Sequence, residues 1–503
     1  MTSTAALARS LAPAPSPFVP MTGTHRMLTG VLLIGTLVAI GLYQMFNPSG
    51  NAELGGVFAG LIANFALMLV PVVFYQPGFG WFHPLIFGLF FTYLDHLRRI
   101  DVYLSGLQWH AALSGWSAES LTALLGQELW LQGLGLAAWY GGYVLSPALP
   151  APAVQFQRPR HLAAKVSGAV LLSAALFAVY MQSRGGIVSH ILSWGAGRNE
   201  ALAGAFYWQF FTQLGLIGCL SWLVIDPRST VRPLFWGCTI TSLMMVYLTG
   251  GSRSSVIYFM IMGVLAWLLR ERKIAVMQLV AIALVGLFLM GILGNLRAST
   301  YGGTIDWNVL RGGVPAESTT GESALTSGLS EVSQRTSVYA GVFPILGLVP
   351  DQVDFINGSS YLAVLTLPVP RALWPEKPGL VAGRVGETFF DMPVGMPPGA
   401  VGEAFWNFGV PGVAIVFFLF GIFTRWLADS FRTYAEQPAA IVLYVITLFL
   451  LAEPSGLSII AWLMMLVPAV AFLMAIGAMT LGKTAGVKGQ RLPFEKRAPS
   501  PTE

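Results

Sequence analysis

The chain has 503 residues, of which 55% are hydrophobic and 10% charged, with a formal net charge of +5. This composition excludes a soluble globular protein and indicates an integral membrane protein. The basic residues lie in short clusters beside apolar runs, without an RNA- or DNA-binding motif, so we expect no nucleic-acid partner.

Apolar runs recur along almost the whole chain. About 20 apolar residues cross a bilayer as a helix, and backbone polar groups in lipid must be hydrogen-bonded internally. We therefore predict an all-α polytopic fold with about twelve transmembrane helices. They lie near residues 27–46, 55–74, 80–95, 121–146, 165–181, 205–225, 233–249, 254–269, 274–294, 409–425, 438–452 and 456–480. The third and eleventh are short, and either could be broken or re-entrant. The first run has the full length of a span and no small-residue cleavage site, so we expect no cleavable signal peptide.

Composition divides the chain into three parts. Residues 1–24, rich in Ala, Pro, Ser and Thr, and residues 482–503 are expected to be disordered cytoplasmic tails. Residues 25–481 form one polytopic membrane domain without a convincing internal repeat. A loop over residues 295–408 interrupts the apolar runs.

Charge predicts the orientation. With both termini in the cytoplasm, the majority of the 28 Lys and Arg residues fall in the short inner segments and the two tails. That bias obeys the positive-inside rule. The long loop is then extracytoplasmic.

Two outer segments precede that loop. Residues 182–204 contain Arg184 and Arg198 beside glycines. The turn before residue 254 places Ser252 and Arg253 after a pair of glycines, at the outer end of a predicted span. Glycines allow close backbone approach, and hydroxyl and helix N-terminal donors suit an anion. The alternative for Arg253 is an interfacial arginine whose head-group reaches water.

The long loop carries further cations. Arg297 directly follows a predicted span, and Arg371 and Arg384 flank a proline-rich turn that holds Trp374 and Lys377. A guanidinium binds phosphate bidentately and stays charged, so several together could hold a lipid-linked pyrophosphate. The alternative for Arg384 is a solvated charge paired with Glu387 and Asp391. Residues 312–331 are polar, whereas residues 337–374 are apolar again and predict short interfacial helices.

Glu403 and Asn407 lie four residues apart, immediately before the predicted span at Gly409. On a helix this spacing places both on one face, at the outer rim. A partly desolvated carboxylate there could act as general base for a sugar hydroxyl, or Glu403 could be a helix N-terminal cap. Glu128, inside the fourth run, is a functional candidate or a structural hydrogen-bonding group.

Nothing in the pattern predicts a cofactor or a metal. The outer segments hold no Asp-x-Asp, Asp-x-Glu or Glu-x-Asp pair, and the outer histidines His96, His110 and His190 are expected to be structural. Cys219 and Cys238 fall inside predicted spans, as buried small residues do.

Four segments together resemble the oligosaccharide repeat unit polymerases, the O-antigen polymerase (Wzy-type) family of bacterial surface-polysaccharide enzymes. They are Thr249-Gly-Gly-Ser-Arg253, Gly358-Ser-Ser-Tyr361, Pro370-Arg-Ala-Leu-Trp-Pro-Glu-Lys-Pro378 and Gly402-Glu-Ala-Phe-Trp-Asn-Phe-Gly409. The polar insertion at residues 312–331 departs from the pattern of the family.

The resemblance implies a GT-C-like glycosyltransferase of the bacterial inner membrane that needs no metal. Such enzymes transfer a growing glycan from undecaprenyl pyrophosphate onto a new lipid-linked repeat unit. Arg253, Arg371 and Arg297 would then bind the pyrophosphate, while the role of Glu403 as activating carboxylate is inferred from its position alone. The implied partners are lipid-linked glycans and membrane lipid, with a chain-length regulator and a flippase as candidate protein partners.

Two other functions remain open. An O-antigen ligase would share the span count, the long loop and the arginines, but would transfer to the lipid A core. A transporter or flippase for lipid-linked glycans predicts two similar halves and charges at the membrane midplane.

Overall fold

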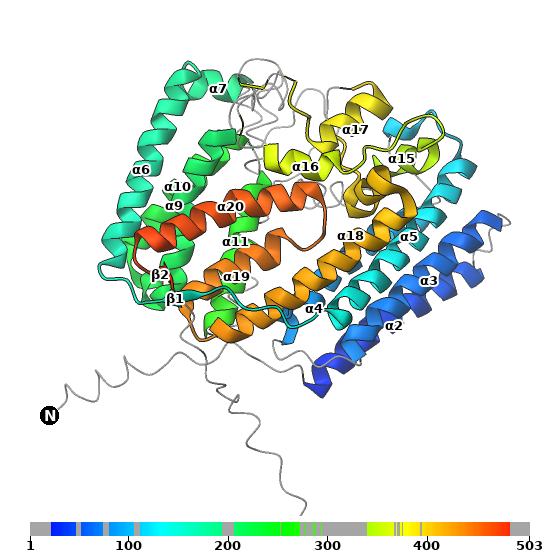
Figure 1. Ribbon diagram of the computed structural model, residues 1–503, viewed down its shortest axis with the longest axis horizontal. Coiled ribbons are helices and arrows are strands. Elements are labelled where there is room, and N and C mark those ends of the chain that lie inside the picture. The colour runs from blue at the N-terminus through cyan, green and yellow to red at the C-terminus, as the bar shows by residue number, and fades with distance from the viewer. Residues whose placement is uncertain are drawn as a thin grey trace, which may run out of the picture.

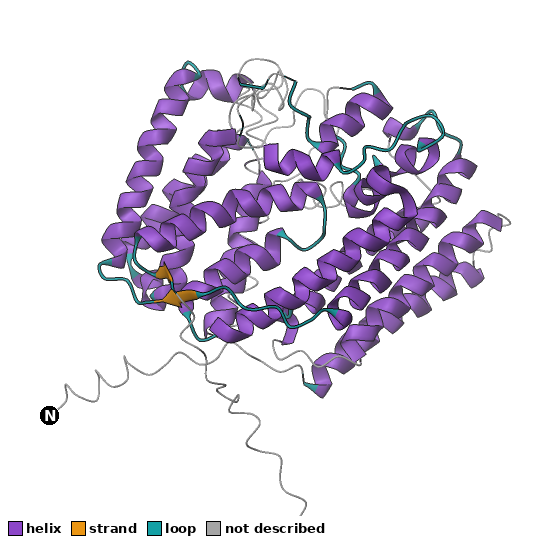
Figure 2. Ribbon diagram, viewed as in Figure 1, coloured by secondary structure: helices purple, strands orange, loops and turns teal. Residues whose placement is uncertain are grey.

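A computed structural model describes residues 22–46, 52–73, 80–104, 111–193, 206–251, 253–271, 340–366, 376–392 and 395–482, together with isolated positions between 277 and 293 and at 369, 373 and 374. The described chain is almost entirely helical, with one short two-stranded sheet (Figure 2). Its helices are α2 (Gly23–Phe46), α3 (Ala52–Val73), α4 (Pro84–Leu104), α5 (Ala118–Leu145), α6 (Leu162–Ser183), α7 (Ile187–Ser193), α9 (Phe206–Ile225), α10 (Pro233–Gly250), α11 (Arg253–Glu271), α15 (Val342–Leu348), α16 (Ser359–Thr366), α17 (Val381–Phe390), α18 (Gly399–Tyr434), α19 (Pro438–Leu450) and α20 (Gly456–Ala475). The 3₁₀ turns are η1 (Gly80–Phe82), η2 (Ala111–Leu113) and η4 (Pro227–Val231), and the strands are β1 (Val154–Phe156) and β2 (Met479–Leu481).

Six of the described helices are long and apolar enough to cross a membrane, namely α3, α6, α9, α10, α18 and α20. Shorter apolar stretches occupy parts of α2, α4 and α19. The chain is therefore a multi-pass membrane protein with an all-α fold. The span predicted near residues 274–294 lies almost entirely outside the described residues, and every other predicted segment contains a helix. The total of twelve spans stays a prediction.

Local sequence explains where several helices begin. α10 and α19 each start on a proline, which needs no backbone N–H in the first turn. Ser117 and Ser455 cap α5 and α20 by accepting the backbone N–H of the residue three positions later. Helix α2 begins at Gly23, within the last residues assigned to the N-terminal tail.

The helices form two groups, each with its own buried apolar core. The first core joins α3, α5 and residues 400–420 of α18, with contributions from α2, α15 and α17. The second joins α6, α9, α10, α11, α19 and α20, together with Ala428 and Phe431 near the end of α18. Helix α4 contributes to both, through Leu85 to the first and Phe87 to the second.

Two glycines allow α5 and α18 to touch backbone to backbone. A Cβ atom on Gly142 would lie 2.0 Å from the Phe418 carbonyl oxygen, and one on Gly421 would lie 2.2 Å from the Trp139 carbonyl oxygen. Small residues at such crossings let membrane helices pack closely. The pair α5–α18 is accordingly the most extensive helix contact in the described chain.

The strands join distant parts of the chain. β1, which follows α5, pairs antiparallel with β2, which follows α20, with Gln155 opposite Thr480. In Figure 1 this pair lies low on one side of the bundle, whereas α15, α16 and α17, the described helices of the predicted long loop, lie together along the upper edge.

Candidate functional site

Helix α18 is broken at Gly409. This residue has φ 67° and ψ −155°, a conformation that is essentially restricted to glycine, and Pro411 follows it. Residues 399–408 therefore form a separate half-helix, which carries Glu403 and Asn407 one turn apart. The sequence suggests the third and eleventh predicted helices as candidates for a break, whereas the observed break lies at Gly409, where the tenth span is predicted to start.

Three segments meet around the half-helix. Asn407 Nδ2 donates to Ser360 Oγ at 2.8 Å and to the Glu403 carbonyl oxygen at 2.7 Å. Arg384 Nη1 donates to Ser359 Oγ at 2.7 Å. Consecutive serines at the start of α16 thus hold Arg384 from α17 and Asn407 from α18. Two of the motif segments, residues 358–361 and 402–409, are brought together by these bonds.

Arg384 is half-buried, and its guanidinium carbon lies 5.4 Å from the centre of a Trp406 ring. Burial lowers the pKa of this guanidinium, but a guanidinium is not deprotonated in proteins, so Arg384 stays cationic. Among the described residues Arg384 has no carboxylate partner, so the expected alternative of pairing with Glu387 or Asp391 is not found. A desolvated cation held by a hydroxyl and an aromatic ring suits an anionic ligand.

Glu403 is fully buried. Its Oε2 atom accepts the Gly456 backbone N–H at 2.8 Å, at the first turn of α20. A Cβ atom on Gly456 would lie 2.6 Å from Oε1, so only glycine fits there. Glu403 thus accepts an N–H at the start of α20, whereas the expected alternative was a cap at the N-terminus of its own helix.

Tyr361, on α16, lies near the carboxylates of Glu403 and Glu453. Its buried hydroxyl has no hydrogen-bond partner among the described residues. Burial raises the pKa of this phenol well above its usual value, and the charges of Glu403 and Glu453 add to the shift. The hydroxyl is therefore neutral and able to donate.

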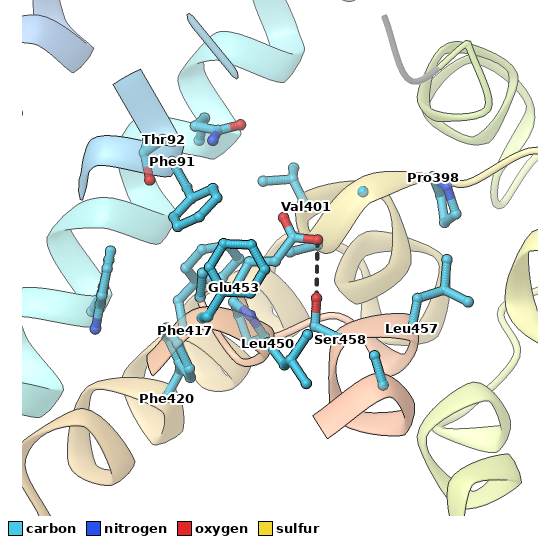
Figure 3. Close-up of a pocket in the computed structure, with 18 of the residues that line it drawn as sticks. Phe91, Thr92, Pro398, Val401, Phe417, Phe420, Leu450, Glu453, Leu457 and Ser458 are labelled. Carbon is cyan, nitrogen blue, oxygen red and sulfur yellow. Dashed lines mark hydrogen bonds between the residues drawn. The ribbon is translucent and has the colours of Figure 1, made fainter. Parts of the chain in front are cut away.

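A cavity of about 490 Å³ adjoins the half-helix, between the two groups of helices (Figure 3). We call it the seam cavity. Its lining comes from α4, α5, α11, both parts of α18, α19, α20 and the turn between α19 and α20: Phe91, Thr92, Glu128, Gln132, Trp139, Tyr258, Pro398, Gly399, Ala400, Val401, Phe417, Phe420, Phe449, Leu450, Ala452, Glu453, Pro454, Leu457, Ser458 and Ala461.

Two carboxylates line this cavity. Glu128, a functional candidate from its place in an apolar run, is buried on α5. Glu453 was missed by the sequence analysis. Its carboxylate lies beside Ser458 in Figure 3, and its Oε1 atom accepts the Ser455 hydroxyl at 2.9 Å. The available signal was an acidic residue in the short break between two apolar runs.

The remaining predicted site residues do not all fall within the described chain. Ser252, Arg198, Arg297 and Arg371 lie outside it, as does the side chain of Arg253, which is the first residue of α11. The described ones are dispersed. Arg184 lies over the Tyr180 ring at the end of α6 (5.4 Å), Trp374 is exposed, and Lys377 Nζ donates to the Val369 carbonyl oxygen.

The described outer histidines have backbone partners. His190 Nε2 donates to the Leu248 carbonyl oxygen at 2.9 Å, and His96 Nδ1 lies 2.8 Å from the Thr92 carbonyl oxygen. His110 lies outside the described residues. Within the residues described, no cluster of three or more His, Cys, Asp and Glu side chains is arranged as a metal site.

The site therefore combines a broken helix, a partly buried arginine and a cavity with carboxylates. Comparison of the chain with protein-family models, with curated proteins and with solved structures finds no match in any of the three.

Proposed function

We propose that the protein is a membrane glycosyltransferase that joins undecaprenyl-pyrophosphate-linked oligosaccharide repeat units into surface polysaccharide. The reaction takes place at the outer face of the bacterial inner membrane, with both termini in the cytoplasm. One observation carries the proposal: Ser359 and Ser360 of one motif segment hold Arg384 and Asn407, and the first residues of the half-helix that carries Asn407 line a cavity large enough for a small-molecule ligand.

The arginine suits the leaving group. When a glycosidic bond to pyrophosphate breaks, negative charge develops on the departing oxygen, and a preorganised cation stabilises it. Removing one such donor costs about 10²–10³ in rate in well-studied enzymes. Arg384 is preorganised by Ser359 and by the Trp406 ring. Arg253, Arg297 and Arg371 are the further pyrophosphate contacts that the resemblance to the polymerases implies.

The membrane assists the reaction. Donor and acceptor are both tethered to the same bilayer, which raises their effective concentration and aligns their head-groups with the rim of the bundle. A Gly-x4-Gly-Lys-Thr pattern occurs at residues 477–484, but it follows helix α20 and runs through strand β2, whereas an ATP-binding loop lies between a strand and a helix. Cleavage of the pyrophosphate linkage itself then drives the transfer.

The test is deletion of the gene in its host, with surface glycans separated by size. A polymerase predicts glycans limited to a single repeat unit, restored to full length by the wild-type gene. Polymer stranded on the carrier lipid would instead identify a ligase, and loss of both single-repeat and polymeric glycans a flippase. Unchanged polymer would reject all three.

A further inference from the structure

We propose that the seam cavity binds the sugar residues of the acceptor, and that Glu453 is the carboxylate that receives the proton of the acceptor hydroxyl. Glu403 then serves as a positioning residue for Glu453. This inference rests on the proposed function and assigns the acceptor side of the same site.

The wall of the cavity has the chemistry that a sugar requires. Aromatic rings from α4, α5 and α18 line it, including Phe91, Trp139 and Phe420. Hydroxyl, amide and carboxylate groups lie among them, namely Thr92, Gln132, Ser458, Glu128 and Glu453. Pyranose rings present C–H faces that pack on aromatic rings and hydroxyls that bond to polar groups. A purely apolar acyl chain would form no hydrogen bonds with the polar groups of this wall.

The position of the cavity suits a membrane-tethered acceptor. Residues 398–401 form part of its wall and belong to the half-helix that carries Glu403 and Asn407. Asn407 is bonded through Ser360 to the α16 segment that also holds Arg384. The cavity and the arginine are therefore attached to one cluster of elements, with the acceptor sugars on one side and the pyrophosphate on the other.

Glu453 can reach an acceptor, whereas Glu403 cannot do so in this structure. Glu453 is partly exposed and lines the cavity, and Ser455 and Ser458 orient its Oε1 atom at 2.9 and 3.5 Å. Glu403 is 0% exposed and is not part of the lining. Its Oε2 atom instead holds the Gly456 N–H, three residues after Glu453. Glu403 thus fixes the turn from which Glu453 projects.

The transfer step balances with these groups. The acceptor oxygen forms a bond to the anomeric carbon of the donor glycan, while the bond from that carbon to the pyrophosphate oxygen breaks. The acceptor proton passes to the Glu453 carboxylate, and the bonding electron pair leaves with undecaprenyl pyrophosphate. The proton then returns to solvent or to the released pyrophosphate.

Conservative variants separate the two carboxylates. We would purify full-length protein in lipid nanodiscs and measure chain extension on lipid-linked repeat units extracted from the deletion host. Glu453→Gln should lower the rate about 10²–10⁴-fold, because the amide cannot take a proton. Glu403→Gln should lose no more than about tenfold, because its amide oxygen still accepts the Gly456 N–H, whereas Glu403→Leu should lose far more. Glu119→Gln, exposed in the first turn of α5, is the unchanged control.

Binding is tested separately from turnover. Saturation-transfer NMR would use methyl glycosides of glucose, galactose and N-acetylglucosamine with the protein in nanodiscs. Ala461→Phe, which fills the cavity, should abolish the transferred signal, whereas Ala137→Phe on the exposed face of α5 should not. Equal signals in both variants, or none in the wild type, would overturn the assignment of the cavity.

The outcomes also distinguish this inference from the proposed function. Polymer that survives gene deletion rejects the proposed function. If deletion abolishes the polymer but the purified Glu453→Gln and Ala461→Phe variants both extend chains at the normal rate, the acceptor site alone is rejected. Glu403→Gln as inactive as Glu453→Gln would reject the positioning role of Glu403.

Discussion

Arg384 lies over Trp406, with its guanidinium carbon 5.4 Å from a ring of the indole and one nitrogen bonded to Ser359 Oγ. The two residues come from different helices, α17 and the half-helix of α18. Trp406 itself is almost fully buried, and its Nε1 lies 3.3 Å from the Asp354 carbonyl oxygen. A rigid ring therefore sets the position of the cation.

Removal of this cation should impair chain extension. Arg384→Ala is expected to slow extension about 10²–10³-fold while the protein still inserts and folds. Arg384→Lys should recover little of the extension rate lost in Arg384→Ala, because an ammonium neither stacks on the indole nor offers a planar pair of donors. Extension by each purified variant is the measurement. Arg160→Ala, exposed in the segment before α6, provides the control; full activity of Arg384→Ala would reject the role of this cation.

The break in α18 depends on Gly409. A residue with a Cβ atom at φ 67° and ψ −155° is strained, so Gly409→Ala should destabilise the protein by about 1–3 kcal/mol. It should also shift the half-helix and reduce extension. Thermal unfolding in detergent checks the first effect. Gly168→Ala is the matched control, since it lies in the regular helix α6 with nothing within 4 Å of the new Cβ atom.

The α5–α18 crossing tolerates no side chain at Gly142. Gly142→Ala should reduce the yield of folded protein and destabilise it by about 1–3 kcal/mol or more, because the new Cβ atom would clash with the Phe418 backbone. Fluorescence-detected size exclusion and thermal unfolding measure both effects. The neighbouring Gly141→Ala should be nearly neutral, since its Cβ atom would meet the Phe418 ring at 3.8 Å. Equal behaviour of the two variants would contradict the backbone contact.

Orientation can be tested with single cysteines at exposed positions. Asp351→Cys, after α15, should react with a membrane-impermeant maleimide applied from the extracytoplasmic side. Glu436→Cys, between α18 and α19, should react only after the membrane is opened. The native Cys219 and Cys238 are buried and contribute little background. The reverse pattern would place the long loop in the cytoplasm.

Helix positions were predictable from the sequence because the length of an apolar run and a proline at a helix start can both be read from a short stretch of chain. The observed α9 and α10 begin and end within one residue of the predicted ranges. The half-helix was only partly predictable. Glu403 and Asn407 were placed on one helix before Gly409, but hydropathy does not reveal that glycine geometry separates this helix from the span.

The contacts that build the site depend on tertiary packing and could not be predicted. Ser359, Ser360 and Asn407 were all within segments singled out by motif, yet their spacing along the chain does not reveal the bonds between them. Glu453 gave almost no signal, because one carboxylate in the three-residue break between two predicted spans has no periodicity. Its importance depends on the cavity, which forms only when α5, α18 and α20 pack together.

The two separately packed cores have a consequence for the width of the seam cavity. The seam cavity takes Trp139 and Phe417 from one core and Phe449 from the other, so its width depends on how the two halves sit against each other. Helices α4 and α18 contribute to both cores and so help to set how the two halves sit against each other. Substitutions at Leu85 and Phe87, the α4 residues that contribute to the two cores, should therefore alter which glycans are accepted. Substitutions deep within one half should alter thermal stability alone.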